Sequence, residues 1–396
     1  MRKSFVALVA FPAALAAQTG GPAVRLIAAP NASTKPVLSM AAAVRQLPNG
    51  GILVNDIIKR QLVLFDPTLA NATIVADSVS GGANSYGTRP GGIIPYLADS
   101  TLFVDPAELS MFVLGPTGAI ARVASVPRSQ DANMIGSNLQ GTPGLDARGR
   151  IVYRGGAGPQ RITMQRGPSN GAAQTGLPFQ MPDPPDTAAL VRIDPSSRKL
   201  DTATFIKIPK IKMNVSQSEK GMTMTSEINP MPLVDDWAVL SDGSIAIVRG
   251  RDYHIDWVNA DGSTTTSAKL PFDWQRMTDD DKTAVIDSAK AAYAAAAASM
   301  KNGVPANGMA TSDGAPRSMV VMSFGVAGGG GVKTGGGSGL QVTFASINDL
   351  PDYRPAFTAA GSVKADADDN VWIRTTAKRA GAIAGAIYDV VNRKGE

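Results

Sequence analysis

The chain has 396 residues, of which 44% are hydrophobic and 18% charged, and its formal net charge is +5. This composition is typical of a globular protein with a sizeable core, and it excludes a disordered chain. The absence of cysteine excludes disulfides and cysteine zinc sites, and a single histidine excludes a histidine-rich metal centre. The basic residues are scattered and aromatic residues make up only 6%, which argues against nucleic-acid binding.

Residues 1–17 have the features of a secretory signal peptide. Two basic residues precede an apolar run from Ser4 to Leu15, which is too short to span a bilayer, and small residues follow it. We expect cleavage near Ala17, which would make the mature protein secreted or periplasmic, with no membrane insertion after cleavage. The alternative is a buried N-terminal strand or an uncleaved anchor.

A repeat covers most of the remaining chain. A turn, a short β-branched or aromatic strand, a second strand and a second turn recur five times, beginning at LPNGGILV (47–54), LADSTLFV (97–104), LDARGRIVY (145–153), LSDGSIAIV (240–248) and ADADDNVWI (365–373). Asn-Gly and Asp-Gly pairs before apolar runs indicate β-hairpins. The first two repeats are 50 residues apart, and about four strands per period are typical of a β-propeller blade. A β-sandwich of irregular hairpins is the alternative.

We therefore predict an all-β fold, in which 18–396 form one β-propeller domain of four-stranded antiparallel blades. The first and third turns of each blade should share one face of the ring. The longer connections should lie on the opposite face, as insertions over 155–189, 209–236 and 271–356. Because loops on a rigid scaffold commonly carry function, we expect a site on that face.

The last of these insertions contains one predicted helix, over about 279–301. Thr278 is a suitable N-cap, three aspartates follow it, and the remainder is rich in alanine. The glycine-rich stretch of about 302–339 is predicted to be a mobile loop.

The end of the second strand of each blade supplies the candidate binding residues. The first position after its apolar part is polar or charged in all five repeats: Asn55, Asp105, Arg154, Arg249 and Arg374. Such positions would surround the central channel, where the arginines would attract anions and the nearby Asp252 and His254 would complete the site. The alternatives are salt-bridged loop residues and, for His254, a structural histidine hydrogen-bonded between blades.

Four segments resemble exported NHL-like six-bladed propellers of environmental bacteria: VRGRDYHIDWVNADG (248–262), LPFDWQRMTDDDK (270–282), LPDYRPAF (350–357) and AIYDVVNRKGE (386–396). The resemblance implies a six-bladed ring, of which about five blades are visible here. Members of that family continue beyond the last segment, so a C-terminal truncation is expected.

The leading hypothesis is a non-enzymatic binding module that presents its insertion-rich face to a small anionic molecule, a glycan or a protein. We assign no catalytic residue, cofactor or metal, and the sequence does not fix the oligomeric state. The alternative is a metal-dependent hydrolase or lactonase of the gluconolactonase-like propeller type. That class is expected to have acidic and amide ligands around the channel, whereas three of the five channel positions are arginine.

Overall fold

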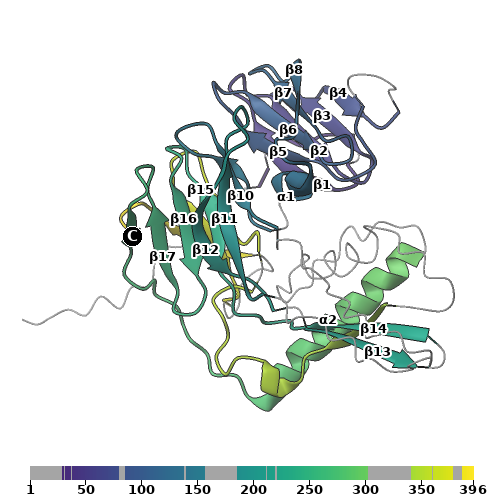
Figure 1. Ribbon diagram of the computed structural model, residues 1–396, viewed down its shortest axis with the longest axis vertical. Helices are drawn as coiled ribbons and strands as arrows, with labels where there is room; N and C mark the ends of the chain where they lie inside the picture. The colour runs from purple at the N-terminus through teal and green to yellow at the C-terminus, as the bar shows by residue number, and fades with distance from the viewer. Residues whose placement is uncertain are drawn as a thin grey trace, which may run out of the picture.

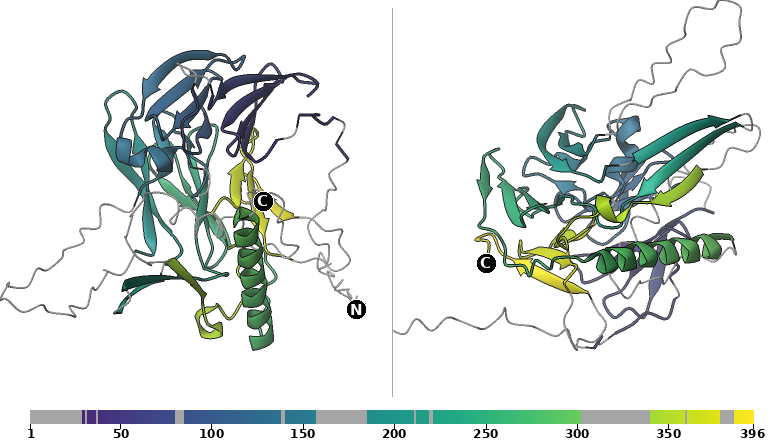
Figure 2. Two further views of the ribbon diagram at one scale, coloured as in Figure 1. Left: turned by 90° about the vertical axis from the view of Figure 1, so that its right-hand side faces the viewer. Right: turned by 90° about the horizontal axis from the view of Figure 1, so that it is seen from below.

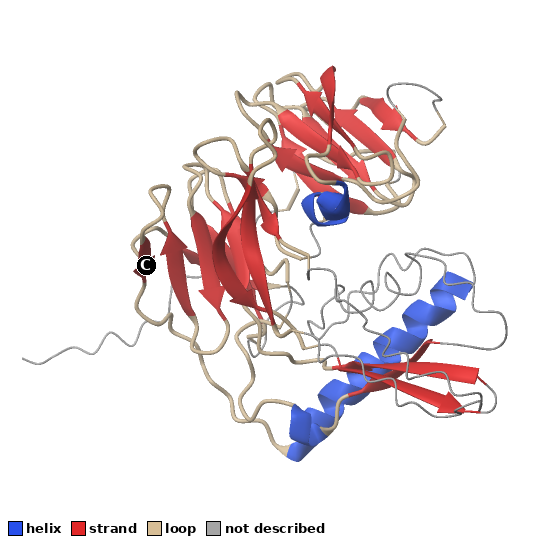
Figure 3. Ribbon diagram, viewed as in Figure 1, coloured by secondary structure: helices blue, strands red, loops and turns tan. Residues whose placement is uncertain are grey.

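The computed structural model describes residues 29–30, 32–36, 38–79, 85–137, 140–156, 185–210, 212–218, 221–301, 340–358, 360–377 and 386–396. Five antiparallel sheets within these ranges form the blades of a propeller, and strands predominate over helices (Figures 1 and 3). The predicted all-β propeller is therefore confirmed. The signal peptide and the glycine-rich stretch of 302–339 lie outside the described residues, and a sixth blade and a truncation remain predictions.

The first two blades each have four strands in simple up-and-down order. Blade 1 comprises β1 (Ala41–Gln46), β2 (Ile52–Asp56), β3 (Gln61–Phe65) and β4 (Ala72–Asp77). Blade 2 comprises β5 (Gly92–Pro95), β6 (Thr101–Asp105), β7 (Ser110–Leu114) and β8 (Ile120–Ser125). The Asn49-Gly50 turn joins β1 to β2, and Gly50 has the positive φ of +82° for which glycine is favoured.

The other three blades follow the same order. Blade 3 comprises β9 (Gly144–Leu145), β10 (Ile151–Arg154), β11 (Thr187–Ile193) and β12 (Leu200–Lys207). Blade 4 comprises β15 (Asp236–Val239), β16 (Ile245–Arg249), β17 (His254–Val258) and β18 (Thr264–Thr266). In blade 5 the structure describes three strands, β20 (Val363–Ala365), β21 (Val371–Thr375) and β22 (Ile387–Val391).

The hydrophobic core lies between neighbouring blades. The first strands of successive blades are neighbours, and a buried apolar cluster fills the space between blades 1 and 2, 2 and 3, 3 and 4, and 4 and 5. On β10, for example, Ile151 and Tyr153 pack towards blade 2, whereas Val152 packs towards blade 4. Since side chains alternate along a strand, each blade contributes to two of these clusters.

Two insertions combine into a separate layer beside the ring (Figures 1 and 2). One lies between blades 3 and 4 and forms the hairpin of β13 (Lys212–Ser218) and β14 (Gly221–Ile228). The other lies between blades 4 and 5 and contributes α2 (Asp279–Lys301), β19 (Leu340–Phe344) and the short 3-10 helix η2 (Ile347–Asp349). β19 pairs in parallel with β14, which makes a three-stranded sheet that we call the insertion sheet.

Helix α2 occupies the range in which the sequence favoured a helix. Its N-terminus is held by Thr278, whose hydroxyl accepts a hydrogen bond from Asp281 N and donates one to the Asp281 carboxylate. Ile286 of α2 packs with Ala345 and Leu350 beside the insertion sheet. The sequence did not indicate η2, or the short helices η1 (Ser129–Asp131) and α1 (Ala132–Ile135) that precede blade 3.

The turn between β15 and β16 requires glycine for two reasons. Gly243 has φ +78°, and a Cβ atom there would overlap the backbone nitrogen of Ala147 in blade 3. We expect Gly243→Ala to lower the free energy of unfolding by roughly 1–3 kcal/mol, because backbone strain and displacement of blade 3 add together. Gly262→Ala is the matched control: Gly262 has φ +91° but no atom within 4 Å of the added carbon. Urea unfolding of both variants measures the difference, and equal losses would contradict the close approach.

Candidate functional site

The short turns of the blades lie on one face of the ring. The turn at Gly50 lies against Pro67 of the other short turn in blade 1, and Ser241 of blade 4 donates hydrogen bonds to Asp369 in the corresponding turn of blade 5. Antiparallel connectivity places the ends of the second strands, and the long connections, on the opposite face. The cavities described below lie on this insertion-bearing face.

Arg154 ends β10 on this face and points towards blade 4. Val152, two residues earlier on the same side of the strand, packs in the cluster between blades 3 and 4. The Nε atom of Arg154 is buried and has no hydrogen-bond partner. Because most buried polar side-chain atoms have at least one hydrogen-bond partner, such an atom needs an explanation.

A cavity of about 220 Å³ lies beside Arg154. The residues that line it with Arg154 are small or apolar: Gly156, Pro185, Thr187, Ala188, Ala189 and Ile208. Burial among them lowers the pKa of the Arg154 guanidinium, and the charge of Asp236 acts in the opposite direction. A guanidinium remains charged even so, because its ordinary pKa is far above neutrality. The cavity is therefore lined by one fixed positive charge, and the Nε–H group of that side chain has no hydrogen-bond partner.

Asp236, the first residue of β15, is the acidic residue whose charge raises the pKa of Arg154. It is completely buried, and its Oδ2 accepts a hydrogen bond of 2.8 Å from the backbone N–H of Val363 in blade 5. Burial raises the pKa of Asp236 to about 7, although the backbone donors act against the rise. Near neutral pH the negative charge that opposes Arg154 is thus only partly present.

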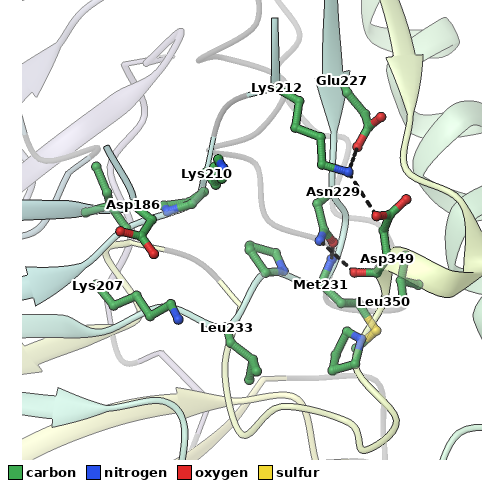
Figure 4. Close-up of a pocket in the computed structure, with 14 residues that line it drawn as sticks. Asp186, Lys207, Lys210, Lys212, Glu227, Asn229, Met231, Leu233, Asp349 and Leu350 are labelled. Carbon is green, nitrogen blue, oxygen red and sulfur yellow. Dashed lines mark hydrogen bonds and ion pairs between the residues drawn. The ribbon is translucent and has the colours of Figure 1, made fainter. Parts of the chain in front are cut away.

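A second cavity, of about 320 Å³, shares Ile208 with the first and reaches the insertion sheet (Figure 4). Its charged residues form two groups. Asp186, Lys207 and Lys210 lie at the side of blade 3, and Lys212, Glu227 and Asp349 lie at the side of the insertion sheet. Apart from Asn229, the rest of the lining consists of apolar residues and prolines: Ile208, Pro209, Met231, Pro232, Leu233, Leu350 and Pro351.

Two residues of the predicted site have structural partners instead of an open cavity. Asn55 is buried, donates to the carbonyl of Gly91 and accepts from the Tyr86 hydroxyl. Asp105 is also buried, and its carboxylate accepts hydrogen bonds from the backbone N–H groups of Gly87 and Ala107. Asn55 of blade 1 and Asp105 of blade 2 thus both bind the connection between β4 and β5.

The predicted residues of blade 4 all have charged partners close by. Arg249 forms ion pairs of 2.7 Å with both Asp235 and Asp256. His254 lies 2.8 Å from Asp252 through Nδ1 and 3.4 Å from Asp256 through Nε2, all within blade 4. These contacts are those expected of the salt-bridged alternative, and the histidine is bonded within its blade instead of between blades.

Arg374 completes the predicted set and is exposed on β21. Its neighbour Ile373 packs towards blade 4, so Arg374 points to the other side of the sheet. Among the predicted positions within the described ranges, Arg154 alone lines either cavity. The predicted residues do not occupy equivalent positions in their blades. Asp105 and Arg249 are in the last residue pair before the turn between the second and third strands, opposite Ser110 and His254. Asn55 lies one residue before the corresponding last pair of blade 1.

The sequence did not single out the charged residues of the second cavity. Lys212 and Glu227 face each other across the β13–β14 hairpin, and Asp349 comes from η2, more than a hundred residues later. Alternating polar and apolar residues over 212–216 and 222–225 were a usable signal for this hairpin. No local pattern indicated that Asp349 joins it.

Within the described part of the chain, no group of three or more histidine and acidic side chains is arranged to hold a metal ion. In the same part of the chain, no helix combines the length and the apolar character needed to cross a membrane.

No protein-family model matches the chain, and no curated protein matches it in sequence. Among solved structures, a Bacteroides fragilis protein described as exported is 13% identical, with a TM-score of 0.33 over 61% of this chain and 55% of that one. Virginiamycin B lyase from Staphylococcus aureus is 10% identical, with a TM-score of 0.32 over 90% and 68%. A gluconolactonase from Xanthomonas campestris is 10% identical, with a TM-score of 0.27 over 60% and 80%.

The match to the B. fragilis protein spans little more than half of that chain, and likenesses this remote say nothing about function. The class of the protein is defined by its own structure: an all-β propeller of five described sheets with an added insertion sheet. Its distinguishing feature is a buried arginine with an unpartnered Nε beside a cavity.

Proposed function

We propose that the protein is an exported, ligand-binding β-propeller that holds the anionic group of a small molecule on Arg154. The unpartnered Nε of Arg154, buried beside a cavity of about 220 Å³, carries this proposal. A polar group removed from water without a partner costs about 1–3 kcal/mol, and more if it is charged. A bound carboxylate or phosphate removes that cost by accepting the hydrogen bond.

The geometry of arginine favours such a ligand. Its planar fork can donate two parallel hydrogen bonds to one carboxylate or phosphate, each worth roughly 1.5–3 kcal/mol when shielded from water. The opposing charge of Asp236 is weakened near neutral pH, since the pKa of this carboxyl is raised to about 7. Small and apolar residues in the rest of the cavity would exclude water from the ion pair.

We expect Arg154→Gln to abolish the response of the protein to anions. Wild type should melt at a higher temperature in acetate, inorganic phosphate or galacturonate than in the neutral sugar galactose, each compared at equal ionic strength. The affinity of the Arg154→Gln variant for the best of these should fall about 10- to 100-fold, since a charge-assisted contact is lost. Differential scanning fluorimetry followed by isothermal titration calorimetry measures both effects.

Arg374→Gln is the matched control for this experiment, because it removes the same charge from an exposed position that lines neither cavity. It should keep the anion response of wild type. If both variants respond as wild type does, or if galactose stabilises the protein as well as galacturonate does, the proposed anion site is wrong.

A further inference from the structure

The second cavity carries charges of both signs, at opposite sides. At the insertion sheet, Lys212 Nζ lies 3.0 Å from Glu227 Oε1 and 2.9 Å from Asp349 Oδ1. One ammonium between two carboxylates leaves this trio with one net negative charge. The Asp349 carboxylate stays ionised at neutral pH, because hydrogen bonds from Lys212 and Ser346 lower its pKa.

The other side of the cavity is positive. Lys207 and Lys210 lie there with a single acidic residue, Asp186 (Figure 4). Ile208, which follows Lys207, also lines the Arg154 cavity, so the two cavities are neighbours on the side that carries Lys207. Arg154 thus lines one of two neighbouring cavities, and the carboxyl residues Glu227 and Asp349 line the other.

Most of the remaining lining of the second cavity is apolar. Met231, Leu233 and Leu350 contribute aliphatic surface, and three prolines line the same space without offering a backbone N–H. Such walls suit aliphatic groups and give an oligosaccharide few partners for its hydroxyls.

We infer that the ligand is a short peptide with free termini, whose carboxylate binds Arg154 and whose ammonium group binds the carboxylates of Glu227 and Asp349. This inference rests on the proposed function, because it uses the same Arg154 contact and adds the opposite end. An extended tripeptide reaches about 10 Å, and its side chains would lie against the aliphatic walls. A simple anion would satisfy only the Arg154 end, and an acidic sugar would leave the negative end without a cation.

The test compares three probes by isothermal titration calorimetry: trialanine, N-acetyl-trialanine and trialanine amide. On wild type, each blocking group should weaken binding about 10-fold or more, equivalent to about 1.4 kcal/mol, because each removes one charged contact. On Glu227→Gln the N-acetyl group should no longer matter, whereas the amide should still weaken binding. On Arg154→Gln the pattern should reverse.

Asp349→Asn, tested in parallel, should lose sensitivity to the N-acetyl group as Glu227→Gln does, and unliganded melting curves establish that each variant folds. Glu108→Gln is the matched control, since Glu108 lines neither cavity. If acetate binds through Arg154 but N-acetylation leaves the affinity of wild type for trialanine unchanged, the peptide assignment is overturned and the anion site stands. If neither acetate nor trialanine distinguishes wild type from Arg154→Gln, the proposed function itself fails.

Discussion

We expect Asp236→Asn to become increasingly more stable than wild type as the pH rises from 5 to 8. The pKa of the buried Asp236 carboxyl is raised from 3.8 to about 7, so the folded protein holds this proton more tightly than the unfolded chain does. Its stabilising contribution is complete below a pH of about 4 and is lost as the pH rises through 7. Three pKa units correspond to about 4 kcal/mol in full, and asparagine avoids this loss because it carries no charge.

Urea unfolding of both proteins at several pH values measures the effect. Asp66→Asn provides a control of opposite sign: hydrogen bonds from Thr68 and Asn71 lower the pKa of this exposed carboxyl, so its ionised form stabilises the fold. Asp66→Asn must therefore not gain stability with pH. If the free energies of unfolding of wild type and Asp236→Asn change in the same way with pH, ionisation of Asp236 does not destabilise the fold and the prediction is wrong.

A second large effect is expected at the junction of blades 3 and 4. Trp237 is completely buried there, packs in the cluster with Val152 and Leu190, and donates from Nε1 to the carbonyl of Gln140. Trp237→Ala should lower the free energy of unfolding by about 3–5 kcal/mol, since it leaves a large cavity and an unpaired carbonyl. Chemical denaturation followed by circular dichroism measures the loss.

Trp274→Ala is a suitable comparison, because Trp274 is 37% exposed and lies in the connection that leaves blade 4. Its loss should be clearly smaller, as less surface is returned to water. A similar loss for the two variants would indicate that the interface between blades 3 and 4 contributes no more than a surface contact does.

The blades were predictable because each blade is marked by short sequence signals, namely its turn residues and its apolar runs. Positive-φ residues such as Gly50, Gly149 and Gly243 occupy the hairpin turns at which the sequence placed Asn-Gly, Arg-Gly and Asp-Gly. The apolar runs that follow these turns are the buried second strands. Both signals depend only on neighbours in the chain, which is why they hold without knowledge of the tertiary structure.

The candidate site was predictable only in part. Arg154 was correctly placed at the end of a strand, but the direction of a strand-end side chain depends on a shift of a single residue. Asn55 and Arg249 show the consequence: Asn55 donates to Gly91 in the connection that leads to the following blade, whereas Arg249 donates to Phe205 in β12 of the preceding blade. The negative side of the second cavity depends on the parallel pairing of β14 with β19. Nothing in the sequence of either strand indicates that it pairs with the other.

That parallel pairing also constrains how the protein can change over evolutionary time. The hairpin β13–β14 precedes blade 4 in the sequence, and the segment α2–β19 follows it. The two nevertheless form one structure, because β19 pairs with the edge of β14 and α2 packs beside the resulting sheet. Deleting either one would leave an unpaired strand edge, which invites aggregation. The two insertions should therefore be inherited as a unit: a related propeller that lacks one should lack both, and a graft onto another ring must carry both with blade 4 between them.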